Sequence, residues 1–485
     1  MSITAALANA NSGLAVASRR AGVVSNNVAN ALTPGFARRT AQISQNVFAG
    51  TGAGVSFDGV TRASDPVVTR SRRLADSTLI RDQTIAATYG NFNNVLGEPG
   101  DPFSLFTQYQ NFESSLRSLS QTPESNSLQA QVLDAANTLT STFRQLAANA
   151  VSTRQNADAE ISNQVNFVNN LLKEVEKLNS EISVASNSRQ DATGLEDQRK
   201  ILIDQISEII PVKEIRMPSG KINLITDEGA YLISGTARQL SFTPTNNIGP
   251  GMTFAGGILS GLTLEGADLT PSSGSTFEIT QGALAGLFAV RDDIAPEFQM
   301  KMDGLARDVI ERFEGIDPTL TPGDPGLFTD AGAAFNPATE IGLSSRIAVN
   351  AAVDPDQGGA VWRLRDGIGA TTQGASGSAT IILTLLDSLT ALRTPPSGTG
   401  LSGSLSAIAA AADVTSSIGR SRISAETLLA STAARSRLLT DAEQSVTAVD
   451  TDFELQQLLL IEQAYSANAR VIQTADAMMR RLMEL

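Results

Sequence analysis

The stretch from Ser25 to Arg39, SNNVANALTPGFARR, decides where the first helix of the chain ends. Pro34 cannot continue a helix and biases Thr33 toward extended conformations, and Gly35 permits backbone angles that other residues resist. Before this break, apolar and small residues recur at alternating spacings of four and three, at Ile3, Leu7, Ala10, Leu14, Ala17, Ala21, Val24, Val28 and Ala31. This spacing is typical of the a and d positions of a coiled coil and predicts an amino-terminal helix with one apolar seam.

A second seam lies at the other end of the chain. Its residues alternate three and four apart and are Leu458, Ile461, Tyr465, Asn468, Ile472, Ala475, Met479 and Leu482. Ala464, Val471 and Met478 lie beside this seam and widen it. We therefore expect the two terminal helices to form one coiled coil, and the carboxyl-terminal helix to keep apolar surface for other subunits.

The two seams could also close within one monomer and do nothing else. Much of the first seam is alanine, and each alanine buries little area. At about 25 cal/mol per Å², such burial would hardly offset the entropy lost on ordering about thirty residues. The composition of the seam therefore favours a helix that needs neighbours.

The composition excludes most kinds of enzyme and most ligands. The 485 residues contain no histidine and no cysteine, which removes imidazole and thiolate chemistry. We therefore expect no catalytic residue, no metal and no cofactor. The net charge of −14 argues against nucleic acid, and we expect no membrane insertion because the apolar runs are short. The arginines near the amino terminus are interpreted as solvated or ion-paired, namely Arg38, Arg39, Arg70, Arg72 and Arg73.

Glycine and proline divide the chain into helical and turn-rich regions. Residues 124–193 and 420–485 contain neither, whereas short apolar runs from Val212 onward are separated by turn sequences. Thr122 and Pro123 are expected to start the first of these long helices. The predicted fold is mixed and mainly α, with long coiled-coil-like helices from both chain ends and an outward β domain. The domains expected are a terminal coiled-coil core of 1–40 and 446–485, a long-helix domain of 41–211, 281–316 and 405–445, and a β-rich outer domain of 212–280 and 317–404.

Three short motifs have the residue types of a ligand or metal site. The glycine-rich string from Gly398 to Gly403 follows prolines rather than a buried strand, which favours a linker over a dinucleotide site. Asp292-Asp293 and Asp354-Pro355-Asp356 lack the ligand spacing of a calcium loop and are interpreted as surface turns. A secreted carboxylate-dependent hydrolase therefore remains only a remote alternative.

Three parts of the chain resemble bacterial flagellar axial proteins. The Asn26 to Phe36 motif resembles the amino-terminal signature of this family, and Val449–Leu485, with EQAYSANAR at 462–470, resembles the carboxyl-terminal block shared by rod, hook and hook-associated proteins. The helix LEDQRKILIDQISEI at 195–209 and the segment SGTARQL at 234–240 are similar to the hook-associated proteins of the hook–filament junction. Phe36 stands where the family commonly has tyrosine.

This resemblance implies a structural adaptor that joins hook to filament. Its implied partners are other copies of the chain in a ring or short helical assembly, the hook protein, the next hook-associated or filament-side protein, and an export chaperone. The implied location is extracellular, in the flagellum, after export without a cleaved signal peptide. Another axial subunit, a hook protein or a flagellin, is the nearest alternative.

The expected assembly interface combines the two seams with the amino-terminal motif. It comprises Leu7, Leu14, Val24, Asn26, Asn27, Val28, Asn30, Pro34, Gly35, Phe36, Leu458, Ile461, Tyr465, Asn468, Ile472, Met479 and Leu482.

Overall fold

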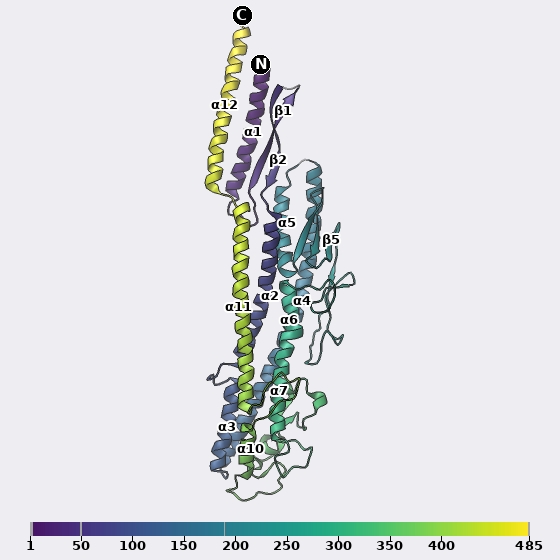
Figure 1. The fold of residues 1–485 in the computed structure, drawn as a ribbon, viewed down its shortest axis with the longest axis vertical. Helices are drawn as coiled ribbons and strands as arrows, with labels where there is room; N and C mark the ends of the chain where they lie inside the picture. The colour runs from purple at the N-terminus through teal and green to yellow at the C-terminus, as the bar shows by residue number, and fades with distance from the viewer. Residues whose placement is uncertain (1–2, 49–50, 189, 484–485) are drawn as a thin grey trace. The chain divides into compact units, whose positions relative to one another are not determined.

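The structure is a computed structural model that describes residues 3–48, 51–188 and 190–483. Helices dominate it (Figure 1). They are α1 (Ile3–Ala29), α2 (Pro66–Leu96), α3 (Leu105–Gln121), α4 (Asn126–Asn187), α5 (Thr193–Ile209), α6 (Gly282–Ala289), the π-helical η1 (Val290–Ile294), α7 (Ala295–Phe313), α8 (Leu343–Arg346), α9 (Arg363–Asp366), α10 (Thr380–Thr390), α11 (Ala407–Thr447) and α12 (Thr451–Met483), with short 3-10 turns η2 (Pro337–Thr339), η3 (Ala351–Val353) and η4 (Pro355–Gln357). The predicted fold class, mainly α with long helices at both chain ends and sheets between them, is confirmed.

Small antiparallel sheets occupy the remainder of the described chain. They are the hairpin β1 (Arg39–Phe48) and β2 (Thr51–Arg62), the sheet β3 (Val212–Arg216), β4 (Ile222–Thr226), β5 (Tyr231–Ser234) and β6 (Thr236–Ala237), the sheet β7 (Leu240–Ser241), β8 (Thr263–Leu264) and β9 (Ala267–Asp268), and the pair β10 (Phe328–Asp330) and β11 (Ile347–Val349). The strands β3 to β5 pair in chain order, with Val212 opposite Thr226 and Leu224 opposite Ile233. The meander expected from Val212 onward is therefore confirmed.

The chain forms two compact units. Unit 1 consists of Met1–Leu79, Asn166–Gln239 and Thr432–Leu485, and unit 2 consists of Ile80–Val165 and Leu240–Ser431. Three of the four boundaries fall within α2, α4 and α11, and the fourth lies between β6 and β7. The division into three domains expected from the sequence stays a prediction.

Unit 2 has an aromatic core. The rings of Phe92 and Phe298 stack with their centroids 4.2 Å apart, and Phe112 meets Phe328 edge to face at 5.4 Å. These rings belong to a buried cluster that joins α2, α3, α4, α7 and α10, so the helices of this unit pack against one another. Offset and edge-to-face contacts of this kind add to the stabilisation from area burial.

Three local expectations are wrong. Thr122 is the carboxyl-terminal cap of α3, and α4 begins at Asn126 with the Ser125 hydroxyl accepting from the Leu128 amide. The hairpin of β1 and β2 lies where a helical domain was expected. In the described part of 317–404, strands are limited to β10 and β11, because glycines with left-handed backbone angles, such as Gly342 and Gly358, break this region into single turns.

The motifs weighed as sites are structural. Asp292 and Asp293 lie in η1 rather than in the expected surface turn, and Asp292 pairs with Arg291, the two atoms Nη2 and Oδ2 being 2.8 Å apart. Asp354 accepts from the Asp356 amide in a 3-10 turn, as a turn residue should. Within the described ranges, no group of histidine, cysteine or acidic residues is arranged to hold a metal ion. None of the helices that the structure describes is long and apolar enough to cross a bilayer.

Candidate assembly interface

The terminal helices α1 and α12 lie side by side and run in opposite directions (Figure 1). Ala17, Val24 and Ile461 form a small buried cluster between them, with Ala21 and Leu458 packed against it. Among the described residues of α12, Glu454, Ile461 and Ala475 are buried, and they are spaced by seven and by fourteen positions, which are one and two heptads. One row of α12 therefore faces α1, and the expected pairing of the two seams is present within unit 1.

Much of the predicted seam lies outside this contact. Leu14, Val28, Leu458, Asn468 and Ile472 are half-buried, whereas Leu7, Tyr465, Met479 and Leu482 are exposed. Of the alternate seam positions on α12, Leu458 packs at the edge of the buried cluster and Ile472 is half-buried, whereas Tyr465 and Met479 are exposed. Within the monomer, only part of the expected seam therefore lies in the contact between α1 and α12.

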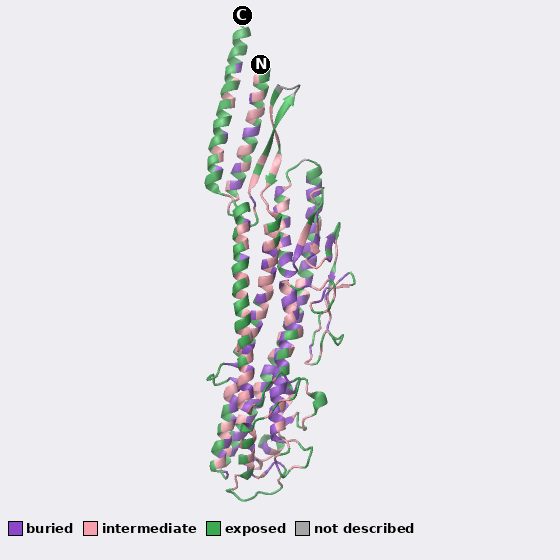
Figure 2. Cartoon of the chain, in the orientation of Figure 1, coloured by how far each residue is buried: buried purple, intermediate pink, exposed green. Residues whose placement is uncertain are grey.

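Beside the buried row, α12 carries a second line of apolar side chains, which we call the exposed row. It consists of Phe453, Leu460, Val471 and Met478, which are 41%, 56%, 45% and 52% exposed. Figure 2 shows α12 exposed along most of its length. A contiguous line of large apolar side chains in water is the usual mark of a surface that another protein covers. Near its upper end an open groove of about 300 Å³ is lined by Ile3, Ala6, Val471, Ala475 and Met478, with Arg470 and Thr474.

The amino-terminal motif holds the hairpin to the end of α1. Asn27 is fully buried, and its side-chain amide brackets the backbone of Arg39: Nδ2 donates to the Arg39 carbonyl at 2.8 Å and Oδ1 accepts from the Arg39 amide at 2.9 Å. The Asn27 side chain thus makes with Arg39, the first residue of β1, the two hydrogen bonds that the backbone of a neighbouring strand could make. A buried amide with both groups bonded is far less costly than one left open, which explains asparagine at this position.

Gly35 lets the chain approach α5. Its φ angle is +78°, and a Cβ at this position would lie 2.6 Å from the side chain of Ile201. Both features exclude larger residues here. Phe36, half-buried, lies under the guanidinium of Arg39 at 4.8 Å from the ring centroid. Gly35, which follows the end of α1, therefore also lets the chain pass close to α5.

The Asp-Gln-Arg sequence of α5 completes this junction. Asp197 accepts from Nη2 of Arg39 at 3.0 Å and pairs with Arg62 through its other oxygen, so it ties both strands of the hairpin to α5. Two residues later, Arg199 donates from Nη1 to Oδ1 of Asn179 at 2.9 Å and to the Gly220 carbonyl at 2.8 Å. The motif thus joins the hairpin, α4 and the turn between β3 and β4.

A second set of contacts fixes the start of α12. The Arg38 amide donates to the carbonyl of Thr447 at 2.8 Å, and its guanidinium donates to Glu454 and lies over the ring of Phe453 at 4.6 Å. Glu454 is 1% exposed and would be a costly buried charge without this partner. The connection after α1 and the first turn of α12 are therefore held together.

Beneath these junctions lies a partly buried ionic network. Arg72 pairs with Asp204, Asp76 and Glu443, and Arg73 pairs with Asp204 and Glu214. Burial alone would raise the pKa of Asp204, but the nearby Arg73, Arg72 and Lys200 outweigh it and lower the pKa to about 2. The network links α2, α5, α11 and β3 within unit 1, so the segment that leads into α12 is anchored by charge.

The predicted interface residues fall into two groups. Asn27 and Gly35 shape the junction inside the monomer, and Val24 and Ile461 pack within it. Asn26 and Pro34 are exposed, and Asn30 is half-buried and donates to the Asn26 carbonyl at 2.9 Å. Periodicity missed Arg38, Asp197 and Glu454, although Glu454 continues the heptad spacing of Ile461 by one step toward the start of α12.

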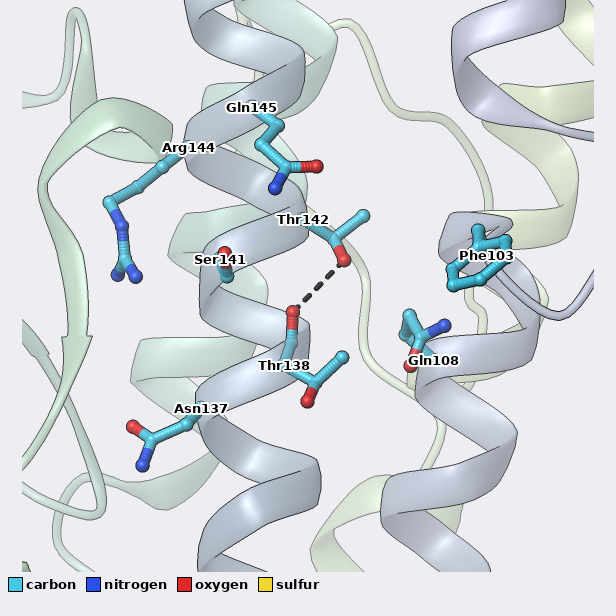
Figure 3. Close-up of a pocket in the computed structure, with 8 residues that line it drawn as sticks. All are labelled: Phe103, Gln108, Asn137, Thr138, Ser141, Thr142, Arg144 and Gln145. Atoms are coloured by element: carbon cyan, nitrogen blue, oxygen red, sulfur yellow. Dashed lines mark hydrogen bonds between the residues drawn. The ribbon is translucent and has the colours of Figure 1, made fainter.

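A larger groove in unit 2 carries no recognisable catalytic set. It has a volume of about 460 Å³ and lies between α3 and α4, with Phe103 and Gln108 facing Thr138 and Thr142 (Figure 3). The Thr142 hydroxyl donates to the Thr138 carbonyl at 2.9 Å, as hydroxyls on helices commonly do. Its lining, all within the described chain, contains no carboxylate, so a carboxylate-dependent hydrolase finds no support there.

Two family models match this chain. Residues 89–318 match the flagellar hook-associated protein FlgK helical domain, and residues 445–485 match the flagellar basal body rod FlgEFG protein C-terminal region. The second match covers α12 with the buried and exposed rows, and the first covers the glycine-free helices and the Asp-Gln-Arg motif. Both matches fall where the sequence showed a resemblance.

Curated proteins give the same result. Flagellar hook-associated protein 1 of Bacillus subtilis is 23% identical over 94% of this chain and 93% of its own length. The protein of the same name from Escherichia coli is 28% identical over 49% of this chain and 45% of its own length, so the aligned part spans about half of that relative. A solved flagellar hook junction protein FlgK from Burkholderia pseudomallei aligns at 20% identity with a TM-score of 0.44, over 54% of this chain and 47% of that one. The family models and the curated relatives together show that the chain is similar to flagellar hook-associated proteins.

Proposed function

We propose that this chain is a structural subunit of the bacterial flagellum that joins hook to filament. The observation that carries the proposal is the exposed row of α12. Leu460, Val471 and Met478 are about half exposed and Phe453 is partly covered by Arg38, on a helix anchored at its first turn. Anchoring fixes where the row starts, and exposure leaves it available to neighbours. An adaptor needs both.

The partners follow from this surface and from the family. Copies of the chain in a ring or short helical assembly cover the exposed row first, because identical subunits present it at identical places. The hook protein contacts this assembly on one side, and the next hook-associated or filament-side protein contacts it on the other. A chaperone shields the apolar ends before export, and export proceeds without a cleaved signal peptide.

The proposed role requires no catalysis. The ionic clusters of unit 1 are built from paired charges, with Arg72 and Arg73 held by carboxylates from α5, α11 and β3. The three-part division, with a terminal coiled-coil core, a long-helix domain and an outer domain, suits this role, because the core of a tubular assembly is made by the chain ends.

Deletion of the gene tests the proposal. Electron microscopy of the deletion strain should show complete hooks without filaments, with filament subunits released into the medium. Complementation with the intact chain should restore attached filaments and controls for effects on neighbouring genes. Filaments of normal length on the deletion strain would contradict the junction role.

A further inference from the structure

The contact between α1 and α12 contains a polar side chain opposite a glycine. Glu454, Ile461, Asn468 and Ala475 follow one another at intervals of seven and form the row of α12 that faces α1. Asn468 is the neutral polar member of this row and is half-buried. Its Nδ2 donates to the Ala464 carbonyl at 2.9 Å, so its own amide hydrogen is bonded within α12.

Gly13 is the residue of α1 that lies beneath Asn468. A Cβ added to Gly13 would lie 2.7 Å from Nδ2, 2.9 Å from Cγ and 2.9 Å from Oδ1 of Asn468. The asparagine therefore occupies the space that any other residue at position 13 would need. Glycine inside a helix costs about 1 kcal/mol relative to alanine, and at position 13 the close approach of the Asn468 side chain accounts for it.

We propose that Asn468 and Gly13 fix the axial register of α12 against α1. Sliding α12 by one heptad, about 10 Å, would place Asn468 against Ala6 or Arg20, which carry the Cβ that Gly13 lacks. The apolar members of the row, Ile461 and Ala475, would still find apolar or small partners after such a slide. A single polar residue in a coiled-coil seam is a known way to specify register at some cost in stability.

The register sets the axial position of the exposed row of α12 relative to α1. A slip of one heptad would move Leu460 to the height that Phe453 occupies in the pair. The inference rests on the pairing of α1 with α12 and not on the junction role, so the two can fail separately.

The chain contains no cysteine, which makes disulfide trapping a clean reporter of register. Ala21 and Leu458 pack against the same buried cluster, so Ala21→Cys with Leu458→Cys reports the register of the structure. Leu14→Cys or Val28→Cys, each with Leu458→Cys, reports a slip of one heptad in either direction. Each pair is introduced into the full chain and oxidised under identical conditions in the assembled protein, in which the terminal helices are ordered.

The test variant is Gly13→Leu, because a Cβ alone could be accommodated by rotation of the Asn468 amide. Gly22→Leu is the matched control, since Gly22 lies in the same helix and a Cβ there would meet nothing within 4 Å. Gly13→Leu should lower the Ala21–Leu458 crosslink about tenfold and increase a slipped crosslink, as overpacking of this size predicts. Adding Asn468→Ala should restore the first crosslink to within about twofold of the parent.

Three results would overturn the inference. The first is an unchanged crosslink ratio in Gly13→Leu. The second is failure of Asn468→Ala to restore the ratio, which would mean that leucine acts through something other than the asparagine. The third is loss of the Ala21–Leu458 crosslink in the Gly22→Leu control, which would mean that the helices do not pair in this way.

Discussion

Arg38 donates from Nε to Oε1 of Glu454 across 2.7 Å, although 416 positions separate the two residues in the chain. Glu454 is the most buried residue of the α12 row, and Arg38 follows the turn that ends α1. The pair therefore couples the exit from the first helix to the entry into the last. The Arg38 guanidinium and the Glu454 carboxylate compensate each other's charge, so the turn after α1 and the first turn of α12 stabilise each other.

Replacing Arg38 with glutamine tests this coupling. The variant leaves the Glu454 carboxylate buried without its charged partner. We expect this to destabilise the terminal pair by about 2 kcal/mol, which is less than for a fully buried ion pair because the Arg38 side chain is 31% exposed. We expect the Ala21–Leu458 disulfide crosslink to fall several-fold. Arg70→Gln is the control, since that arginine is 58% exposed and lies 3.7 Å from Asp227. Equal losses in the two variants would contradict a specific role for Arg38.

The ionic network predicts acid sensitivity of unit 1. The folded-state pKa of Asp204 is about 2, below its ordinary value of 3.8, so its ionised form stabilises the fold. This contribution, about 2 kcal/mol, is complete well above the unfolded pKa and is lost as the pH falls from about 5 to about 2. Urea unfolding followed by circular dichroism should show the loss, and Asp204→Asn should reduce it.

Asp324 supplies the control for this experiment. Its carboxylate is fully exposed, and its pKa is lowered by hydrogen bonds from Thr321 rather than by buried arginines. Asp324→Asn should leave the acid dependence of unit 1 as in the parent. If Asp204→Asn and the parent lose stability in parallel, the network does not control acid unfolding.

The terminal helices were largely predictable from sequence, and the junction between them was not. The seam spacing and the Pro34-Gly35 break identified α1 to within a few residues, because both depend on nearby residues only. The hairpin was missed because Ile43 and Val47 face water, and its stability comes from β2 packing on α1, where the Val55 amide donates to the Ser12 hydroxyl. Such a contact produces no periodic pattern of residues in the sequence.

The ion pairs of the site show the same limit. Arg38, Asp197 and Glu454 are ordinary charged residues of exposed-looking helices and loops until the fold brings them together. Charge pairs distant in sequence obey no spacing rule, so a single sequence cannot identify them. The resemblance of the Asp-Gln-Arg segment marked the region, and only the structure supplies its partners, Arg39, Arg62 and Asn179.

Substitutions in the exposed row should impair assembly without impairing folding of the chain. Val471→Asp places a charge on a surface that is 45% exposed in the monomer, so the chain should fold but lose motility in the complemented deletion strain. Gln473→Asp, two positions away on the exposed back of α12, is the control and should swim normally. Leu14→Asp and Ile472→Asp, which lie half-buried in the seam, should behave like the deletion. Full motility of Val471→Asp would remove the exposed row from the mechanism.

The purified monomer should have unprotected ends and an ordered middle. Helices α1 and α12, with 27 and 33 residues, are about 40 Å and about 50 Å long. In the described chain, the apolar cluster between them is small and consists of Ala17, Val24 and Ile461 with two half-buried neighbours. Burial this small cannot offset the backbone entropy of two long helices, whose stability must come from packing.

Ordering of the ends is then completed when neighbouring subunits cover the exposed row, so folding and assembly become one event. Amide exchange and limited proteolysis of the monomer should find roughly the first and last 35 to 45 residues unprotected, and protection should appear on assembly. Within each end, the residues next to the Arg38–Glu454 pair should keep their protection from amide exchange longest, because the ion pair holds them in place. Strong protection throughout α1 and α12 in a dilute monomer would mean that the ends form a self-contained bundle, and the coupling of folding to assembly would then be wrong.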